Sequence, residues 1–397
     1  MSNGVRAVHV YHHNDMDGKM SAAYFFNFIK RYDKSYTRTI FRSIDYSVEI
    51  DLDNIHKNDM VVFLDYSFSN NKNWESFINL INKKDNDILW IDHHKTSEDR
   101  FEYFLNKTEE NEKCDGLDDD CTITKMYDSV NGNIFYYNEP KLTVYYTKDY
   151  CATYATWVYC HTMLNNIDKN ADYELYLDPT KNNVPLMVQY VDSYDCWKMN
   201  KPNTHDFNYA MDRYINKPKK VFDKLTYPED LDIFVENSEL RTFEKGIIKT
   251  IVSDGKKIHA YLDTRNRSIR CNGGKIEFNI RIHHNFYRCV AMNIHGNSMV
   301  FGELYNEYDI VCPFHMLNTN NGCWKYSLFS RLKFENGAKT CEDIAKAIGS
   351  TKNAFSGGGH SNAAGFVLKK QIITPGCTIN INKNIFGHYK IKIDNPY

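Results

Sequence analysis

The sequence predicts an α/β fold: a large N-terminal domain with a mostly parallel sheet flanked by helices, a linker helix, and a smaller C-terminal α/β domain. Short apolar runs at 5–11, 60–64 and 88–91 are typical of buried strands. Helical segments at about 18–32 and 74–81 separate these runs along the chain. Strands that alternate with helices usually lie parallel in one sheet, because each helix carries the chain back across it.

The domain boundaries are expected where the composition changes. We expect the N-terminal domain at 1–225, the charged linker helix at 226–255 and the C-terminal domain at 256–397. A segment at about 98–146 breaks the strand–helix alternation and is interpreted as an insertion. Its acidic stretch at 109–120 indicates a solvated loop rather than a calcium site, and aromatic residues near its end predict a hairpin.

The composition favours an intracellular protein without a membrane anchor. The 397 residues include 11 cysteines but no Cys-x-x-Cys pair, so we expect neither a disulfide framework nor a zinc ribbon. No basic-then-apolar segment precedes the first strand, and no apolar run has the length of a membrane span. A formal net charge of −2 excludes a basic coat for duplex nucleic acid. The expected location is the cytoplasm.

Side chains that can bind metal follow each predicted strand of the N-terminal domain. An acid and two histidines end the run at 88–91, a single acid ends the run at 60–64, and the first strand leads into a His-Asn-Asp-Met-Asp-Gly sequence. Another apolar run, at 188–191 in a segment that can form either a helix or a buried strand, also leads into an acid. Ligands of open α/β sheets bind at the carboxyl ends of the strands, so these groups are expected to converge. The candidates are His13, Asp15, Asp17, Asp65, Asp92, His93, His94 and Asp192.

This number of converging acids favours metal binding over structural pairing. Carboxylates that lie close together raise each other's pKa, and a divalent cation removes that repulsion. Mixed imidazole and carboxylate ligands suit Mn²⁺, Fe²⁺ or Zn²⁺, whereas an oxygen-rich site suits Mn²⁺ or Mg²⁺. The set is larger than one ion requires. It therefore indicates two ions that share a bridging carboxylate, as in many enzymes that hydrolyse phosphoesters.

Five motifs, in order along the chain, resemble those of the DHH/DHHA1 phosphoesterases. The first three are His13–Gly18, the single acid Asp65, and Asp92–His94, which corresponds to the motif that names the family. The fourth, Asp192–Trp197, is similar to an acid followed by a second acid and an aromatic residue. The fifth, Gly357–Gly365, resembles the glycine-rich motif of the associated DHHA1 domain.

The resemblance implies a role for each candidate. Two cations are expected, with Mn²⁺ favoured and Mg²⁺ as the alternative. Asp92 would orient a histidine, and His94 would stabilise the phosphoryl oxygens or assist proton transfer. The metal ligands would be His13, Asp15 and Asp192 on one ion, Asp17 and His93 on the other, and Asp65 between them.

The resemblance also implies that the C-terminal domain binds the substrate. Family members often carry Ser-Leu-Arg-Ser in a strand, and Phe329 occupies the place of that arginine here. Arg331, two residues further on, would lie on the same face of a strand and could replace it. Three successive glycines would let backbone N–H groups approach a phosphate closely. The expected substrate-binding residues are Gly357, Gly358, Gly359, His360, Asn362 and Arg331.

The predicted function is hydrolysis of short oligonucleotides to 5′-mononucleotides, as in the oligoribonuclease or cyclic-nucleotide phosphodiesterase subgroup. The substrates would be nano-RNA or linear or cyclic dinucleotides. Two enzymatic alternatives stay open: a single-strand-specific DNA exonuclease of the RecJ-like type, and a 3′-phosphoadenosine 5′-phosphate phosphatase. A nucleotide-sensing module is the non-enzymatic alternative, against which the intact candidate ligands count. Short single-stranded RNA or DNA is the expected partner, no membrane is expected, and a homodimer stays open.

Overall fold

The computed structural model describes most of the chain and divides it into two compact units. The units are Met1–His259 and Ala260–Tyr397. The second unit therefore begins four residues after the predicted start of the C-terminal domain. No helix among the described residues is both long and apolar enough to cross a membrane. The described residues are 6–46, 49–83, 85–94, 96–97, 100, 134–139, 141–164, 184–225, 227, 233–234, 238–317, 322–333, 338–383 and 389–395.

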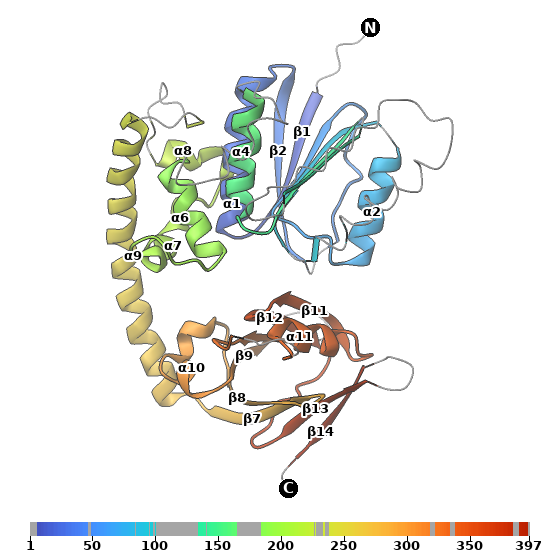
Figure 1. The fold of residues 1–397 in the computed structure, drawn as a ribbon, viewed down its shortest axis with the longest axis vertical. Coiled ribbons are helices and arrows are strands. Elements are labelled where there is room, and N and C mark those ends of the chain that lie inside the picture. Colours follow the sequence, from blue (N-terminus) through green and yellow to red (C-terminus); the bar gives the residue numbers. More distant parts are fainter. Residues whose placement is uncertain are drawn as a thin grey trace. The chain divides into compact units, whose positions relative to one another are not determined.

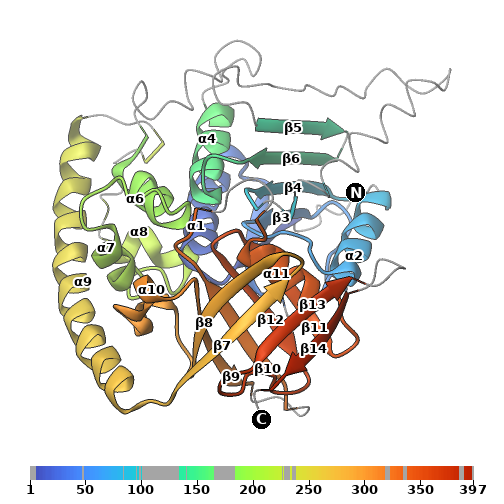
Figure 2. The same cartoon turned by 60° about the horizontal axis from the view of Figure 1, so that its bottom comes forward.

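The first unit contains a six-stranded sheet with the order β2-β1-β3-β4-β6-β5 (Figures 1 and 2). Its first five strands in that order are parallel to their neighbours, and β5 is antiparallel to β6. The predicted α/β class with a mostly parallel sheet is thereby confirmed. The strands are β1 (Arg6–His13), β2 (Tyr36–Ile44), β3 (Met60–Leu64), β4 (Asp87–Asp92), β5 (Ile134–Glu139) and β6 (Leu142–Thr147).

Helices cover both faces of this sheet, as the continuous apolar runs require. Val10 and Val62 face a core that includes α1 and α4, whereas Val61 and Trp90 face a core that includes α2. Figure 1 shows α1 and α4 on one side of the strands and α2 on the other. The helices of this unit are α1 (Met16–Tyr32), α2 (Asn71–Asn82), α4 (Ala152–Leu164), α6 (Leu186–Asp195), α7 (Thr204–Met211), η1 (Pro218–Lys220) and α8 (Val221–Lys224).

Two segments differ from their expected roles. The run at 188–191 lies within helix α6, so Asp192 does not follow a strand. The hairpin expected near the end of the insertion is present as β5 and β6, but β6 pairs with β4 and belongs to the central sheet. The acidic stretch at 109–120 lies outside the described residues.

A single long helix, α9 (Ser238–Asn272), contains the boundary between the units. Its first part buries Ile248 and Ile251 in the core of the first unit. Near its end, Arg270 donates a hydrogen bond to the carbonyl of Val300 in the second unit. The helix extends beyond the segment expected for the linker, at 226–255, into residues expected in the C-terminal domain.

The second unit is built on an eight-stranded mixed sheet with the order β11-β12-β10-β9-β8-β7-β13-β14. The β8–β9 and β7–β13 pairs are parallel and the other pairs are antiparallel. Helix α11 packs on one face, and the η2 and α10 segments pack on the other. The elements are β7 (Lys275–Ile282), β8 (Asn285–Asn293), η2 (Ser298–Phe301), α10 (Leu304–Glu307), β9 (Ile310–Met316), β10 (Trp324–Phe329), α11 (Cys341–Gly349), β11 (Ala354–His360), β12 (Ala363–Leu368), β13 (Thr378–Lys383) and β14 (Tyr389–Asp394).

Candidate metal centre

The first motif forms the junction between β1 and α1. Asp15 is the N-cap of α1, and its Oδ1 accepts a hydrogen bond from the Gly18 N–H at 2.9 Å. A Cβ atom on Gly18 would lie 2.4 Å from the carbonyl oxygen of His13, so only glycine permits this close turn. The junction places His13 Nδ1 2.6 Å from Asp15 Oδ2.

Asp17 connects the first motif to α4. Its two carboxylate oxygens accept backbone hydrogen bonds from Ala152 and Thr153, both at 2.7 Å, at the start of that helix. The negative charge is stabilised there because a helix N-terminus presents free N–H groups. Asp17 Oδ2 also lies 3.6 Å from His93 Nε2. A carboxylate has about four acceptor sites, so these bonds leave capacity for a cation.

Asp65 is a buried carboxylate without a hydrogen-bond partner among the described residues. It follows β3 with a φ of 58°, a left-handed conformation that is uncommon for a non-glycine residue. Both of its side-chain oxygens are buried and unsatisfied. Such a group is costly unless a ligand binds it.

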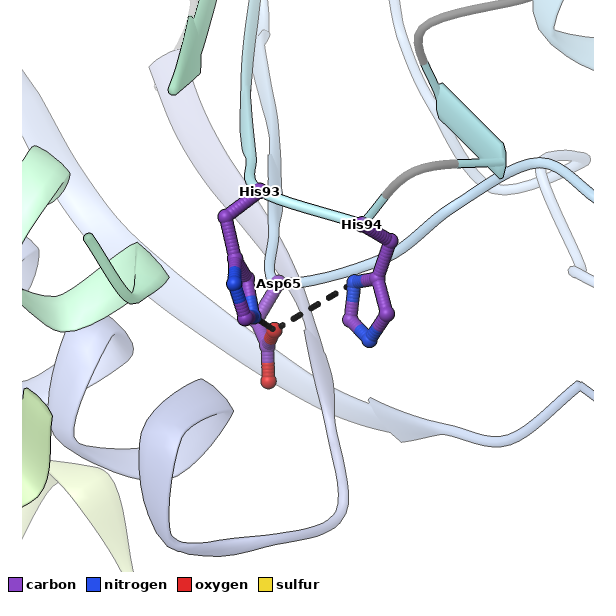
Figure 3. A group of neighbouring side chains, drawn as sticks. All are labelled: Asp65, His93 and His94. Atoms are coloured by element: carbon purple, nitrogen blue, oxygen red, sulfur yellow. Dashed lines mark ion pairs between the residues drawn. The ribbon is translucent and has the colours of Figure 1, made fainter. Parts of the chain in front are cut away.

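Three imidazoles surround the Asp65 carboxylate. His93 Nε2 lies 3.3 Å from Asp65 Oδ1, and His94 Nδ1 lies 3.7 Å from the same oxygen. Figure 3 shows the two rings on either side of the carboxylate. On the other oxygen, His13 Nδ1 lies 3.7 Å from Asp65 Oδ2. These distances exceed those of ordinary hydrogen bonds and leave space for an ion between the groups.

The acidic groups of the cluster are buried close together, and this shifts the pKa values of several of its members. Burial, together with the charges of Asp15 and Asp17, raises the pKa of Asp65 well above its usual range. Burial and the Asp17 charge also raise the pKa of Asp195. Burial lowers the pKa of His13, but its contacts with Asp15 and Asp65 outweigh that effect and raise it to about 11. A divalent cation among these groups would relieve the repulsion between the carboxylates.

The fourth motif contributes Asp195 to the cluster, not Asp192. Asp195, the last residue of α6, places Oδ2 3.2 Å from His93 Nε2. Asp192 instead accepts hydrogen bonds from the Cys151 N–H at 3.0 Å and from Lys198 Nζ at 2.7 Å. The expectation for Asp192 rested on its place directly after the apolar run, but in the helix its carboxylate accepts a hydrogen bond from the start of α4. The geometry therefore favours Asp195, the second acid of this motif, as a ligand.

The residues present fit a divalent metal centre. Among the described residues, three groups have ligand atoms within 4.8 Å of one another, and two of the groups share Asp65 while two share His93. Imidazole and carboxylate donors in this combination suit Mn²⁺, Fe²⁺ or Zn²⁺. The groups are His13 with Asp15 and Asp65, Asp65 with His93 and His94, and His93 with Asp195 and Cys196.

Asp92 and Tyr46 fix the orientation of His94. Asp92 Oδ1 lies 2.8 Å from His94 Nδ1, and its other oxygen accepts a hydrogen bond from Ser97. On the opposite side of the ring, the Tyr46 hydroxyl lies 3.3 Å from His94 Nε2. The Tyr46 ring centroid also lies 5.0 Å from that of His13. Tyr46 was not a candidate in the sequence analysis, since no motif contains it.

The glycine motif of the second unit forms the end of β11 and the start of β12, which pair with each other. A Cβ atom on Gly357 would lie 2.0 Å from the Ala345 carbonyl oxygen in α11. Gly359 has a φ of 139°, which L side chains rarely adopt. Close packing therefore accounts for these two glycines, whereas a Cβ atom on Gly358 would meet nothing within 4 Å. The side chain of His360 lies outside what the structure describes.

The two remaining substrate-binding candidates have different surroundings. The Asn362 side-chain amide donates hydrogen bonds to the carbonyls of Ser330 and Leu332, both at 2.9 Å, and so stabilises the chain after β10. Arg331 is exposed, and its guanidinium lies 5.8 Å from the Tyr305 ring centroid. The expectation that Arg331 shares a strand face with Phe329 is wrong, because β10 ends at Phe329.

Comparison with known proteins finds one family model that matches the first part of the chain. Residues 7–160 match the family described as DHH family, N-terminal domain. The matched segment is similar to this domain, and it contains β1 from its second residue, β2 to β6 and most of α4. No curated protein matches the chain.

Several solved structures are similar over most of the chain at low identity. An uncharacterised protein from Helicobacter pylori G27 is 13% identical with a TM-score of 0.32, over 94% of this chain and 95% of its own. Manganese-bound RecJ from Thermus thermophilus is 9% identical with a TM-score of 0.42, over 91% of this chain and 49% of its own. CDC45 from Entamoeba histolytica is 8% identical with a TM-score of 0.35, over 92% of each chain.

Proposed function

We propose that the chain is a metal-dependent phosphodiesterase that hydrolyses short oligonucleotides to 5′-mononucleotides. The observation that carries this proposal is Asp65, whose two buried oxygens lack hydrogen bonds and face three imidazoles. The DHH-family match over 7–160 supports the phosphoesterase class, because this domain contains the cluster except for the residues on α6. The substrates would be nano-RNA or linear or cyclic dinucleotides.

The ligands fall into two sets that share Asp65. His13 and Asp15 lie on one side, and His93 and Asp195 lie on the other. Asp17 approaches the second set through its 3.6 Å contact with His93. When bound, two divalent cations, with Mn²⁺ favoured and Mg²⁺ as the alternative, would activate a water molecule and neutralise charge on the phosphoryl group.

The protein's own groups have separate tasks in this proposal. Asp65 holds both ligand sets together, so its removal should affect both. Asp92 holds the Nδ1 side of His94 and Tyr46 contacts the Nε2 side, which fixes the imidazole for contact with the phosphoryl oxygens or for proton transfer. A fixed donor costs no reorganisation when charge develops on the substrate.

The second unit would bind the nucleotide. Arg331 is exposed and forms no ion pair with a described acidic residue, so its guanidinium is available to a phosphate. The strand backbone is open at Gly358. His360 remains a proposed contact, whereas the amide of Asn362 is bound to backbone carbonyls and is a weaker candidate.

A substrate panel tests the proposal. Hydrolysis would be measured with Mn²⁺ on RNA from dimers to 20-mers, single-stranded DNA, cyclic dinucleotides and 3′-phosphoadenosine 5′-phosphate. We expect the RNA dimers to be cleaved fastest. Asp65→Ala should retain less than about a tenth of the wild-type rate because both ligand sets lose a member. Asp85→Ala removes a surface carboxylate that pairs with Lys57 and is the matched control.

Four outcomes would count against the proposal. Faster cleavage of long DNA would favour the exonuclease alternative, and release of phosphate from the bisphosphate nucleotide would favour the phosphatase. Tight nucleotide binding without turnover would favour a sensing module. Equal loss of activity in Asp85→Ala and Asp65→Ala would remove the argument from the buried carboxylate.

A further inference from the structure

A pocket in the first unit lies between α6, the loop that follows it, and α9. Its volume is about 570 Å³, within the range of sites that hold a small organic ligand. Leu186 and Tyr190 line it from α6, and Ile248 and Val252 line it from α9. Asp195 lies nine residues after Leu186, a separation that corresponds to about 13 Å along the helix and to the opposite side of it. The pocket is therefore distinct from the metal centre.

Four lysines surround this pocket, and none of the described residues that line it is acidic. Lys245, Lys249 and Lys256 come from α9, and Lys201 comes from the loop. None of the four forms an ion pair with a described carboxylate, whereas Lys257 on the same helix pairs with Asp254 at 3.1 Å. Lys245 and Lys249 lie four residues apart on one face of α9, and like charges at that spacing repel each other. A bound anion would remove that repulsion.

Lys201 is the most enclosed of the four lysines. It is half-buried, and its Nζ lies 2.5 Å from Gln189 Oε1 on α6. Burial and the nearby charge of Arg241 lower the pKa of Lys201, whereas the charge of Asp192 opposes that effect. The contact with Gln189 fixes one ammonium group at the edge of the pocket before any ligand binds.

The rest of the lining indicates an organic ligand and not a bare anion. Besides the four apolar residues, Pro202 contributes to the wall. Asn203 and Ser253 add polar side chains that can bond to hydroxyl groups or to a base. None of the exposed large apolar residues lines the pocket, so it lacks the apolar wedge with which a protein enters a membrane surface.

We propose that this pocket is a nucleotide-binding site, in which the four lysines bind the phosphate and the apolar wall contacts the nucleoside. The nucleotide is either free or the end of an oligonucleotide strand, since the chemistry recognised is the same. The inference does not rest on the proposed hydrolysis, because it is drawn from residues outside the metal centre. It would stand if no substrate of the panel were cleaved.

Calorimetric titration of the full chain in EDTA tests this site without activity as a readout. The probes are adenosine 5′-monophosphate, adenosine, inorganic phosphate, an RNA trimer with a 5′-phosphate, and vesicles containing anionic lipid. The variants are Lys249→Gln, Lys249→Gln/Lys256→Gln, and Lys257→Gln as the control on the same helix. All three lysines are exposed, so their substitution removes charge and little packing.

We expect the mononucleotide to bind at least ten-fold more tightly than adenosine or inorganic phosphate. Lys249→Gln should weaken that binding about ten-fold through the loss of one charge-assisted bond, and the double variant should weaken it further. Lys257→Gln should leave it unchanged. If the trimer binds more tightly than the mononucleotide, the pocket binds the end of an oligonucleotide. If the two bind equally, it binds a free nucleotide.

Other results would overturn the inference. Absence of mononucleotide binding at millimolar concentration would do so, as would equal effects of Lys249→Gln and Lys257→Gln. Phosphate that binds as tightly as the mononucleotide would reduce the pocket to a simple anion patch. Vesicle binding that Lys249→Gln abolishes, without nucleotide binding, would assign the lysines to a lipid headgroup.

Discussion

The strand-end cluster of the first unit and the glycine-rich strand β11 of the second differ in what their residues contact. In the cluster, Asp65 is buried and its oxygens lack hydrogen bonds. In β11, Gly357 packs directly against the backbone of α11, and the nearby Asn362 amide is bonded to two carbonyls. The cluster has bonding capacity that the fold does not use, whereas much of the second motif is used by the fold itself.

This difference separates evidence for a ligand from evidence for packing. A buried polar group without a partner costs free energy, so its presence indicates that something outside the chain binds it. A position that only glycine can occupy indicates close contact between backbones. Variants at single residues extend this comparison, and those with the greatest expected effect come first.

The largest effect is expected for the two acids of α6. Asp195→Asn should reduce hydrolysis at least about a hundred-fold and lower Mn²⁺ affinity, because Asp195 faces His93. Asp192→Asn should retain activity and lose about 1 kcal/mol of stability, because it weakens the Cys151 and Lys198 contacts. Steady-state kinetics and metal titration of both variants measure the difference. The reverse pattern would show that Asp192 is the ligand.

A smaller effect is expected for the glycines of β11. Gly357→Ala should lower the free energy of unfolding by about 3 kcal/mol, because the new methyl group would meet the Ala345 carbonyl and not a flexible side chain. Gly358→Ala should change it by less than about 0.5 kcal/mol, since the space there is open. Urea denaturation compares the two variants. Equal stabilities would mean that packing does not explain Gly357.

Glu244 is a buried acid that, unlike Asp65, accepts hydrogen bonds. It accepts hydrogen bonds from the Leu186 N–H and the Tyr227 hydroxyl, yet burial raises its pKa to about 7. The folded protein therefore binds the proton of Glu244 more tightly than the unfolded chain does. The free energy of unfolding falls as the pH rises from the ordinary pKa of a glutamate to the raised pKa of Glu244. From pH 5 to pH 8 the loss should be about 2 kcal/mol.

Urea denaturation at both pH values, for wild type and Glu244→Gln, measures this loss. The variant keeps an acceptor for Leu186 but cannot ionise, so its stability should fall less between the two pH values. A decline as steep in Glu244→Gln as in wild type would assign the pH dependence to other groups.

The smallest effect is expected for Tyr46. Tyr46→Phe removes the hydroxyl beside His94 Nε2 and keeps the ring that packs on Tyr66. The loss of one hydrogen bond should lower kcat about two- to ten-fold, with KM and metal content unchanged. A change in metal content would mean that Tyr46 supports the ligands and not His94 alone.

The parts of the fold that the sequence predicted are those with continuous apolar runs. β3 and β4 are buried on both faces and consist largely of such runs. β2 was missed because Tyr36–Ile44 carries Thr and Arg between its apolar residues, as is common for the edge strand that it forms. β6 was counted in the insertion because its pairing with β4 depends on a contact between distant segments.

The site was predictable where strands supply it and not where other elements do. The strand ends converge by the rule for parallel sheets, which brought Asp65 and His93 together. The choice between Asp192 and Asp195 depends on Cys151 and Lys198, whose positions the sequence does not reveal. Tyr46 lies in the loop after β2, and no motif in the sequence indicated that it would contact the site.

The most direct test of the central claim is Mn²⁺ binding to the wild-type protein and to Asp65→Asn. Titration calorimetry and a metal count should give two ions per chain for wild type and loss of both from the variant, because the two ligand sets share this residue. Metal-free Asp65→Asn should also be more stable than metal-free wild type, since it lacks a buried carboxylate whose oxygens have no hydrogen bonds. Unchanged Mn²⁺ binding in Asp65→Asn, or no Mn²⁺ binding by the wild type, would contradict the account.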